Sequence, residues 1–252
     1  GAKMRLLWVF GLLFYLASCF VRIHQSVTMD DLHWLVATKQ FYRGEVLRSF
    51  FFPGLMAYST HLYLLLVHLT FILFGPHEWV SRLVGVFSGV VTLFLVLQLI
   101  RFFAQGDKDR AFRWGAFVTL LYATTPAFIQ GALILCVEPT ILIPLVLFLF
   151  WAFIQFQRQT RFKWALVTGV AAALAFSARI TTPLLMSFLL GGYALLRKSS
   201  FRTKAYSMMT LFGGFLAFLF LWYLYCEIMK LPFSMPFAYA LQALHSRTQS
   251  TG

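Results

Sequence analysis

The chain has few charged residues, and very few of those are acidic. Charged residues make up 12% of its 252 residues, and only 8 are Asp or Glu. Soluble domains carry roughly 25% charged residues. The composition instead is 60% hydrophobic, with a mean hydropathy of +0.78. These values exclude an ordinary soluble domain and indicate an integral membrane protein.

Several other features are missing. The sequence contains no Asn and therefore no site for N-glycosylation, which favours a bacterial inner membrane. Its three cysteines, Cys19, Cys136 and Cys226, lie in apolar runs without the spacing of metal ligands, so we expect them to be small buried residues. No P-loop, nucleophile elbow, metalloprotease helix or dinucleotide-binding fingerprint is present, which argues against those enzyme classes.

The net charge of +13 does not indicate nucleic-acid binding. The basic residues recur in short clusters between apolar runs, and no single basic patch interleaved with aromatic residues is formed. Because a membrane-spanning helix needs about 20 residues, the chain has room for about seven or eight spans and for no separate soluble domain. We therefore expect an all-α polytopic membrane bundle that forms one module over residues 1–252.

The distribution of basic residues predicts which apolar runs cross the membrane. The eight runs are residues 6–22, 55–74, 82–100, 114–134, 139–156, 164–180, 183–196 and 205–226. If all eight crossed, the Lys- and Arg-rich short loops after residue 100 would lie outside, whereas such loops belong inside. Run 55–74 is the weakest candidate because it contains His61 and His68 and is flanked by Pro-Gly and Gly-Pro pairs.

If run 55–74 stays on one side of the membrane, the sequence predicts seven spans and a cytoplasmic N-terminus. It also predicts a first outer loop of residues 24–81 with two juxtamembrane helices. One of these helices would cover residues 31–43, with Leu32, Trp34, Leu35 and Val36 apolar, and end before Gly44. Six of the eight acidic residues then face outward: Asp30, Asp31, Glu45, Glu78, Glu138 and Glu227. We therefore expect the chemistry on the outer face.

Asp30 and Asp31 are the first candidates for that chemistry. Two adjacent carboxylates repel each other and are relieved by a cation or by sharing a proton, so the pair could bind a divalent cation or act as a general base. Helix capping explains them equally well. Glu138, which is followed by Pro139, either begins a helix or adds a second acidic group to the same outer cavity.

Arg82 and Arg179 stand at the outer ends of apolar runs. A guanidinium there suits a phosphate or pyrophosphate group, and extension of the side chain to the lipid headgroups is the alternative for each. His61 and His68 are seven residues apart, yet no third ligand lies nearby, so histidines at the membrane interface are expected and a zinc site is not.

In its order of parts the chain resembles the C-type (GT-C) membrane glycosyltransferases, notably the bacterial aminoarabinose transferases and the protein O-mannosyltransferases. The resemblance covers about residues 20–227 and rests on four motifs. They are Asp30-Asp31 followed by an aromatic, an Ala and a Gly; the segment from Pro53 through Phe74-Gly75 to Arg82; Glu138-Pro139; and Arg179.

The resemblance implies transfer of a sugar from a polyprenyl-phosphate donor to a lipid or protein acceptor on the outer, periplasmic side. It implies that Asp30 is the base or acceptor-orienting carboxylate, and that Arg82 and Arg179 contact the donor phosphate. The family has Lys where Phe52 stands here, and Arg48 or Arg179 would substitute for it. Metal dependence differs among family members and is left open.

Other differences leave alternatives open. Asp31 stands where the family has Glu, and Glu138 where it has Asp. Family members commonly continue with further spans or an outer domain, so we expect a truncated chain, a minimal member or a module completed by a partner chain. A non-catalytic scaffold that keeps the architecture is a further alternative. A lipid-carrier transporter or flippase is the alternative from another class, but it should have charged residues along a path through the membrane. The six outer acids lie at predicted boundaries instead.

Overall fold

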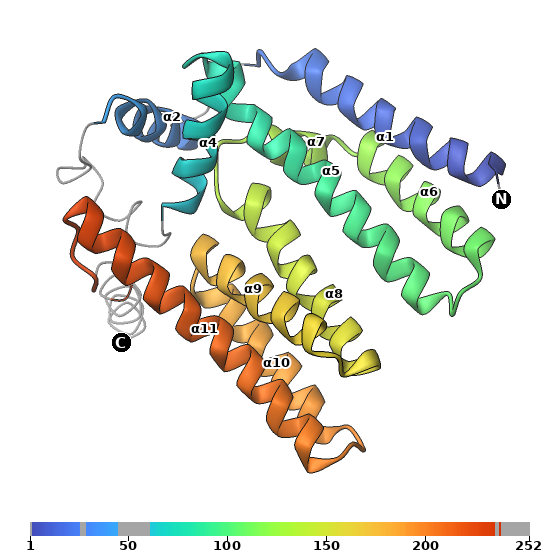
Figure 1. The fold of residues 1–252 in the computed structure, drawn as a ribbon. Coiled ribbons are helices and arrows are strands. Elements are labelled where there is room, and N and C mark those ends of the chain that lie inside the picture. The colour runs from blue at the N-terminus through green and yellow to red at the C-terminus, as the bar shows by residue number, and fades with distance from the viewer. Residues whose placement is uncertain (1, 26–28, 45–60, 235–236, 238–252) are drawn as a thin grey trace, which may run out of the picture. The chain divides into compact units, whose positions relative to one another are not determined.

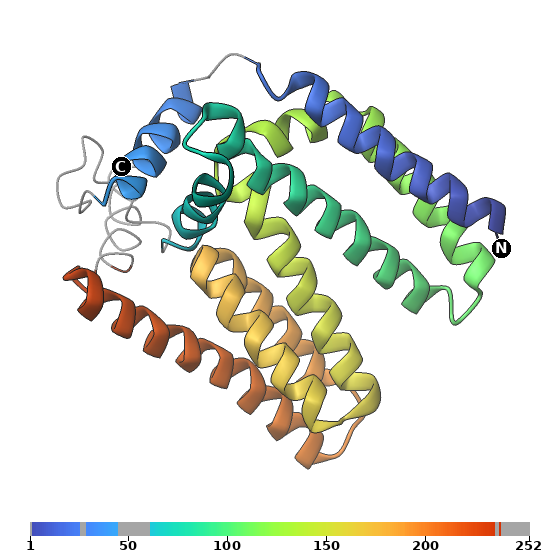
Figure 2. The ribbon, with the colours of Figure 1, turned by 45° about the horizontal axis from the view of Figure 1, so that its top comes forward.

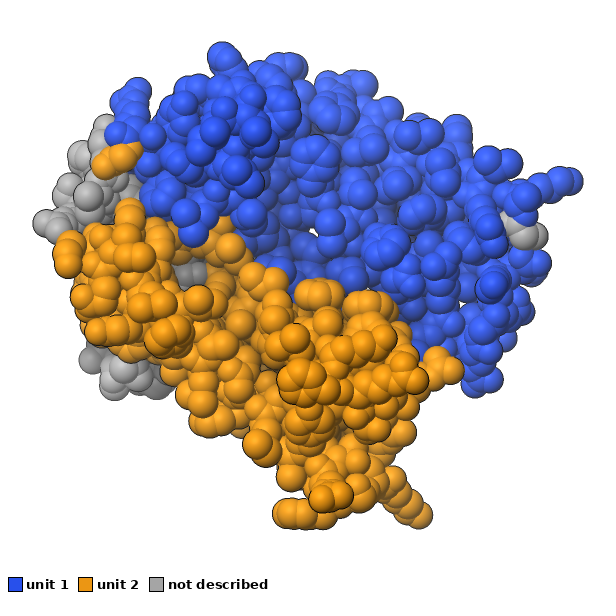
Figure 3. Space-filling view, viewed as in Figure 1, with its two compact units in different colours: residues 1–43, 64–147 blue, residues 44–63, 148–252 orange. Residues whose placement is uncertain are grey.

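The computed structural model describes residues 2–25, 29–44, 61–234 and 237, and the regular structure in these ranges is entirely helical (Figure 1). The all-α prediction is therefore confirmed for this part of the chain. The contacts divide the chain into two units, residues 1–43 with 64–147 and residues 44–63 with 148–252 (Figure 3). That the whole chain acts as one module stays a prediction.

Unit 1 is built on three long helices, α1 (Ala2–Arg22), α5 (Glu78–Phe103) and α6 (Lys108–Thr124). Helices α1 and α6 run side by side (Figures 1 and 2). Helix α5 approaches α1 closely at Gly89, where a Cβ would collide with the ring of Tyr15. The Tyr15 hydroxyl donates a hydrogen bond to the Val86 carbonyl at 3.3 Å. A small residue is thus what allows these helices to approach, as is usual in membranes.

The apolar run 114–134 does not form one straight helix, contrary to the sequence prediction. Helix α6 ends at Thr124 and α7 (Pro126–Leu133) leaves it at an angle of 72°. Pro126 has no N–H to continue the helical hydrogen bonds, and Thr125 before it is extended, at φ −85° and ψ 115°. The Thr125 hydroxyl donates to the Leu121 carbonyl at 2.6 Å, and the Thr125 N–H donates to the same oxygen at 3.1 Å as the last regular bond of α6.

A helix, α2 (Met29–Tyr42), is present where the first juxtamembrane helix is predicted, and Gly44 follows it with a φ of +74°. Its predicted apolar residues differ in their burial within the protein. Trp34 and Leu35 are buried, but Leu32 and Val36 are 46% and 43% exposed. The second is α4 (Leu62–Phe74), which covers the end of run 55–74; residues 55–60 lie outside the described ranges.

The connection from α7 to the next long helix contains an irregular turn. A π-helical turn, η1 (Glu138–Leu142), follows α7 and continues into α8 (Ile143–Gln159). Its wider turn is visible in the hydrogen bond from the Leu142 N–H to the Val137 carbonyl, 3.1 Å long and five residues back. Isolated π turns are frequently found at functional sites.

Unit 2 contains the helices α9 (Phe162–Ala178), α10 (Thr181–Leu196) and α11 (Phe201–Met229). Helices α9 and α11 touch at Gly214, where a Cβ would lie 2.6 Å from the Ala172 Cβ and 2.7 Å from the Gly169 carbonyl oxygen. A buried hydrogen bond of 2.6 Å joins Gln157 Nε2 to Ser207 Oγ. These contacts bind α8 and α9 to α11.

Within the described ranges, four helices are long and apolar enough to cross a membrane, and five if α6 and α7 form one bent span. The four are α1, α5, the stretch Pro139–Gln159 and α11. Helices α4, α9 and α10 are apolar but shorter. The structure therefore supports an integral membrane protein, and the predicted number of seven spans is not confirmed.

Candidate functional site

Asp30 and Asp31 lie in the first turn of α2, but their side chains are outside the described part of the structure. A carboxylate in this position faces the positive end of the helix dipole. Their backbone position is therefore compatible with both readings of the pair, as groups that stabilise the helix start and as reactive carboxylates.

An aromatic cluster holds the other end of α2 against α4. The ring of His68 lies 5.4 Å from that of Phe41, edge to face, and 5.5 Å from that of Tyr42. Tyr42 also meets Phe71 edge to face at 5.6 Å. Such geometry is favourable for aromatic rings. This cluster fixes the helix that carries Asp30 and Asp31.

Arg82 is almost completely buried near the start of α5, with 1% of its surface exposed. Its Nη2 donates to Glu78 Oε1 at 3.1 Å, one helical turn earlier. Its Nε and Nη1 are buried too, and they meet no hydrogen-bond acceptor among the described residues. Extension to the lipid headgroups, the alternative weighed for Arg82, is therefore wrong.

This arrangement is energetically unusual. A guanidinium carries a permanent positive charge and five N–H donors. Burying such a group costs several kcal/mol unless it is paired and hydrogen-bonded, typically about 1–3 kcal/mol for each donor left unsatisfied. Glu78 offsets part of this cost with one hydrogen bond. The remaining donors are suited to an anion that approaches from the other side.

The helix that carries Arg82 contacts α7 and η1. One turn after Arg82, a Cβ at Gly85 would collide with the Ala132 carbonyl and lie 3.0 Å from Thr140 Cγ2. The start of α5 therefore packs directly on the end of α7 and on the π turn. That turn begins at Glu138, whose side chain lies outside the described part.

The predicted site residues are thus divided between the units. The backbones of Asp30, Asp31, Arg82 and Glu138 all belong to unit 1, in which α2 and η1 both contact α5. Arg179 belongs to unit 2, where it ends α9 in an extended conformation, at φ −161° and ψ 145°, and is half-buried. Arg48 lies outside the described residues.

Two contacts were not predicted from the sequence. Glu78 was expected only to face outward, and its pairing with Arg82 becomes visible in the structure, although a Glu four residues before an Arg on a helix is the usual spacing of such a pair. His61 Nδ1 lies 2.6 Å from the hydroxyl of Tyr225, 164 residues away, and its ring meets Trp222 edge to face at 6.1 Å. Burial lowers the pKa of His61 to about 4, so the imidazole is neutral at physiological pH.

The two histidines do not form a shared site. His61 contacts residues of α11, whereas His68 contacts those of α2. In the described ranges no group of three or more His, Cys, Asp or Glu side chains is arranged to hold a metal ion. Because the side chains of Asp30, Asp31 and Glu138 lie outside the description, the divalent cation stays a prediction.

Comparison with known sequences adds one finding. A family model described as dolichyl-phosphate-mannose-protein mannosyltransferase matches residues 60–224, which include Arg82, Glu138 and Arg179. No curated protein and no solved structure gives a significant match.

Proposed function

The chain belongs to the dolichyl-phosphate-mannose-protein mannosyltransferase family, whose members are membrane glycosyltransferases, and on this basis we propose the reaction that it catalyses. The protein transfers a sugar from a polyprenyl-phosphate donor to a hydroxyl or other nucleophilic group of a lipid or protein acceptor. The observation that carries this proposal is the buried guanidinium of Arg82, with two nitrogens that have no acceptor among the described residues.

Arg82 supplies what the donor requires. As the bond between the sugar's anomeric carbon and the phosphate oxygen breaks, its electron pair stays on the phosphate, which gains negative charge. A buried cation stabilises that charge more strongly than an exposed one, because water does not screen it. Arg179 is the second cation of the proposal, and Arg48 is the third.

Asp30 takes the proton of the acceptor as the new bond to the anomeric carbon forms. A carboxylate in this role must reach the acceptor directly or through one water. Asp31 and Glu138 complete the acidic side of the site, where they orient the acceptor or hold a divalent cation. The support for these roles is that α2 and η1 both pack on the helix that carries Arg82.

The proposal includes seven spans: α1, α5, the bent pair α6 and α7, the stretch Pro139–Gln159, α9, α10 and α11. Helices α9 and α10 have 17 and 16 residues, near the lower limit of about 17 for a spanning helix. With α2 and α4 on the outer side, the N-terminus is cytoplasmic. The active site then faces the periplasm of a bacterial inner membrane.

Incubation of the purified protein with a labelled polyprenyl-phosphate sugar and membrane acceptors tests the proposal. We expect transfer by the wild type, a large loss with Arg82→Gln and little change with Arg101→Gln, which removes a charge from the other end of the same helix. A flippase would move the labelled lipid without transfer. A non-catalytic module that needs a partner chain would transfer nothing until that chain is added.

A further inference from the structure

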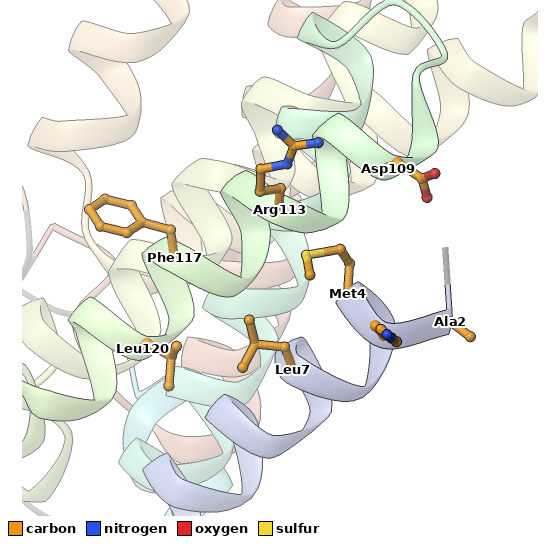
Figure 4. A pocket seen from close by; sticks show the side chains of 8 residues that line it. Ala2, Met4, Leu7, Asp109, Arg113, Phe117 and Leu120 are labelled. Carbon is orange, nitrogen blue, oxygen red and sulfur yellow. The ribbon is translucent and has the colours of Figure 1, made fainter.

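A groove lies between the first half of α1 and the part of α6 from Asp109 to Leu120, far from Arg82. Along α5, the 19 residues from Arg82 to Arg101 span about 28 Å, and α6 begins just after α5 ends. The groove has a volume of about 810 Å³, within the range of about 300–1,000 Å³ usual for ligand sites (Figure 4). Its lining consists of Ala2, Lys3, Met4, Leu7, Asp109, Arg113, Phe117 and Leu120.

The lining changes in character along the helices. The charged side chains Lys3, Asp109 and Arg113 lie near the start of each helix and are exposed. Farther along, the lining is apolar, with Leu7 at 39% and Phe117 at 58% exposed. Figure 4 shows this sequence along α6, from Asp109 through Arg113 to Phe117.

The apolar part of the groove fits within one leaflet of a bilayer. From Arg113 to Leu120 the helix rises about 10 Å, less than half of the roughly 30 Å hydrocarbon core. The groove ends where α1 and α6 come together, since a Cβ at Gly11 would lie 3.1 Å from Thr119 Cγ2 and 3.4 Å from Leu120 Cδ2. A charged opening followed by an apolar channel of this length suits a headgroup and one acyl chain.

The charge around the opening selects the headgroup. Six basic residues and two acidic ones surround the starts of α1 and α6 and the end of α5: Lys3, Arg5, Arg101, Lys108, Arg110, Arg113, Asp107 and Asp109. Asp107 stabilises the start of α6, because its Oδ1 accepts the N–H of Arg110 at 2.9 Å. Basic surfaces between membrane helices attract anionic lipids. Basic loops that orient the chain would not by themselves require an apolar groove beside them.

We infer that this groove binds an anionic phospholipid, with the phosphate at Lys3 and Arg113 and one acyl chain along Leu7, Phe117 and Leu120. Asp109 lies one helical turn before Arg113 and weakens the attraction for the headgroup. The inference does not depend on the proposed transferase activity, because none of these residues belongs to the transfer site.

Native mass spectrometry of the full chain, released from micelles with equal phosphatidylglycerol and phosphatidylcholine, tests the inference. We expect the wild type to retain phosphatidylglycerol preferentially. The double variant Lys3→Gln with Arg113→Gln should lose this preference by about fivefold for each charge removed. Asp109→Asn should increase it, and Leu7→Trp, which narrows the channel without changing the charge, should reduce retention of the lipid.

The matched control is Arg161→Gln with Lys163→Gln, which removes two charges beside the start of α9 and should leave the preference unchanged. Circular dichroism confirms that each variant keeps its helices. Equal retention of the two lipids by the wild type would overturn the inference. So would a control variant that loses as much preference as the Lys3 and Arg113 variant, since binding would then follow net charge and not this groove.

Discussion

Glu78 and Arg82 form an ion pair whose two partners differ in burial. The carboxylate is 41% exposed, the guanidinium is fully buried, and 3.1 Å separates Oε1 from Nη2. The exposed partner can turn toward water at little cost, whereas the buried one cannot. In the proposed mechanism, Glu78 is therefore the counter-ion that an incoming phosphate displaces, and Arg82 is the fixed half of the anion site.

Replacing Arg82 separates a functional role from a structural one. We expect Arg82→Met to reduce transfer by about 10²–10³-fold, the usual effect of removing a donor that stabilises developing charge. The melting temperature should stay the same or rise, because an apolar side chain avoids the cost of burying an incompletely paired charge. A transfer assay and thermal unfolding measure both. A large fall in melting temperature would make Arg82 a structural residue.

Glu78→Gln should act on donor binding. In this variant no carboxylate competes with the donor phosphate for Arg82. We therefore expect a lower KM for the donor and a kcat within a few-fold of the wild type. Glu227→Gln, which removes an exposed acid from α11, is the control and should change neither. A kcat that falls with an unchanged KM would indicate instead that Glu78 takes part in the chemical step.

Asp30→Asn and Asp31→Asn, made separately, distinguish the two readings of the pair. If Asp30 is the base, its variant should lose about 10²–10⁴-fold in transfer, the range typical of general-base catalysis, with unchanged helix content. Asp31→Asn should lose less. Full activity in Asp30→Asn would remove this residue from the mechanism, and a reversed order would assign the role to Asp31.

The stability of the protein should depend on pH through His61. The pKa of His61 is about 4 in the fold and 6.5 in a model peptide, so between these values the unfolded chain binds more protons. The stabilisation from His61 is complete above 6.5 and decreases as the pH falls toward 4. We expect His61→Gln to show a shallower decline in melting temperature over this window. His24→Gln, at an exposed position, should decline as the wild type does.

Accessibility labelling tests the predicted topology. Single cysteines placed at Lys108 and Lys163 should react only from the side of the N-terminus, because short basic loops stay cytoplasmic. A cysteine at Phe233 should react only from the opposite side. Two of the natural cysteines, Cys19 and Cys226, are buried and should contribute little background. Labelling of Lys108 from the outer side would contradict the seven-span arrangement.

Local sequence patterns predict the helices well and their tertiary surroundings poorly. Long apolar runs predict α1, α5 and α11 because a helix in a membrane must be continuous and apolar. The break at Pro126 is not predicted, although proline is the cause, because neighbouring residues can repair a helix around proline and the sequence does not reveal whether they do. In α2 the sequence does not reveal that Ala37 and Thr38 are buried within the protein whereas Leu32 and Val36 are exposed.

The sequence identifies residues of the candidate site but not their burial or their partners. Arg82 stands at the start of an apolar run. The sequence pattern there does not distinguish a side chain that extends to the lipid headgroups from one that is buried. Only the packing of Gly85 on Ala132 reveals which occurs. The pairing of His61 with Tyr225 joins residues 164 apart, and no local pattern contains that information.

The 72° bend between α6 and α7 has a consequence for how the chain is made. Backbone groups released by such a break are costly in lipid unless protein covers them. Helix α5, which packs on α7, is synthesised before it and can offer that cover as α7 leaves the translocon. A nascent chain whose α5 is replaced by an unrelated hydrophobic segment should therefore fail to integrate α7, even though the sequence of α7 is intact.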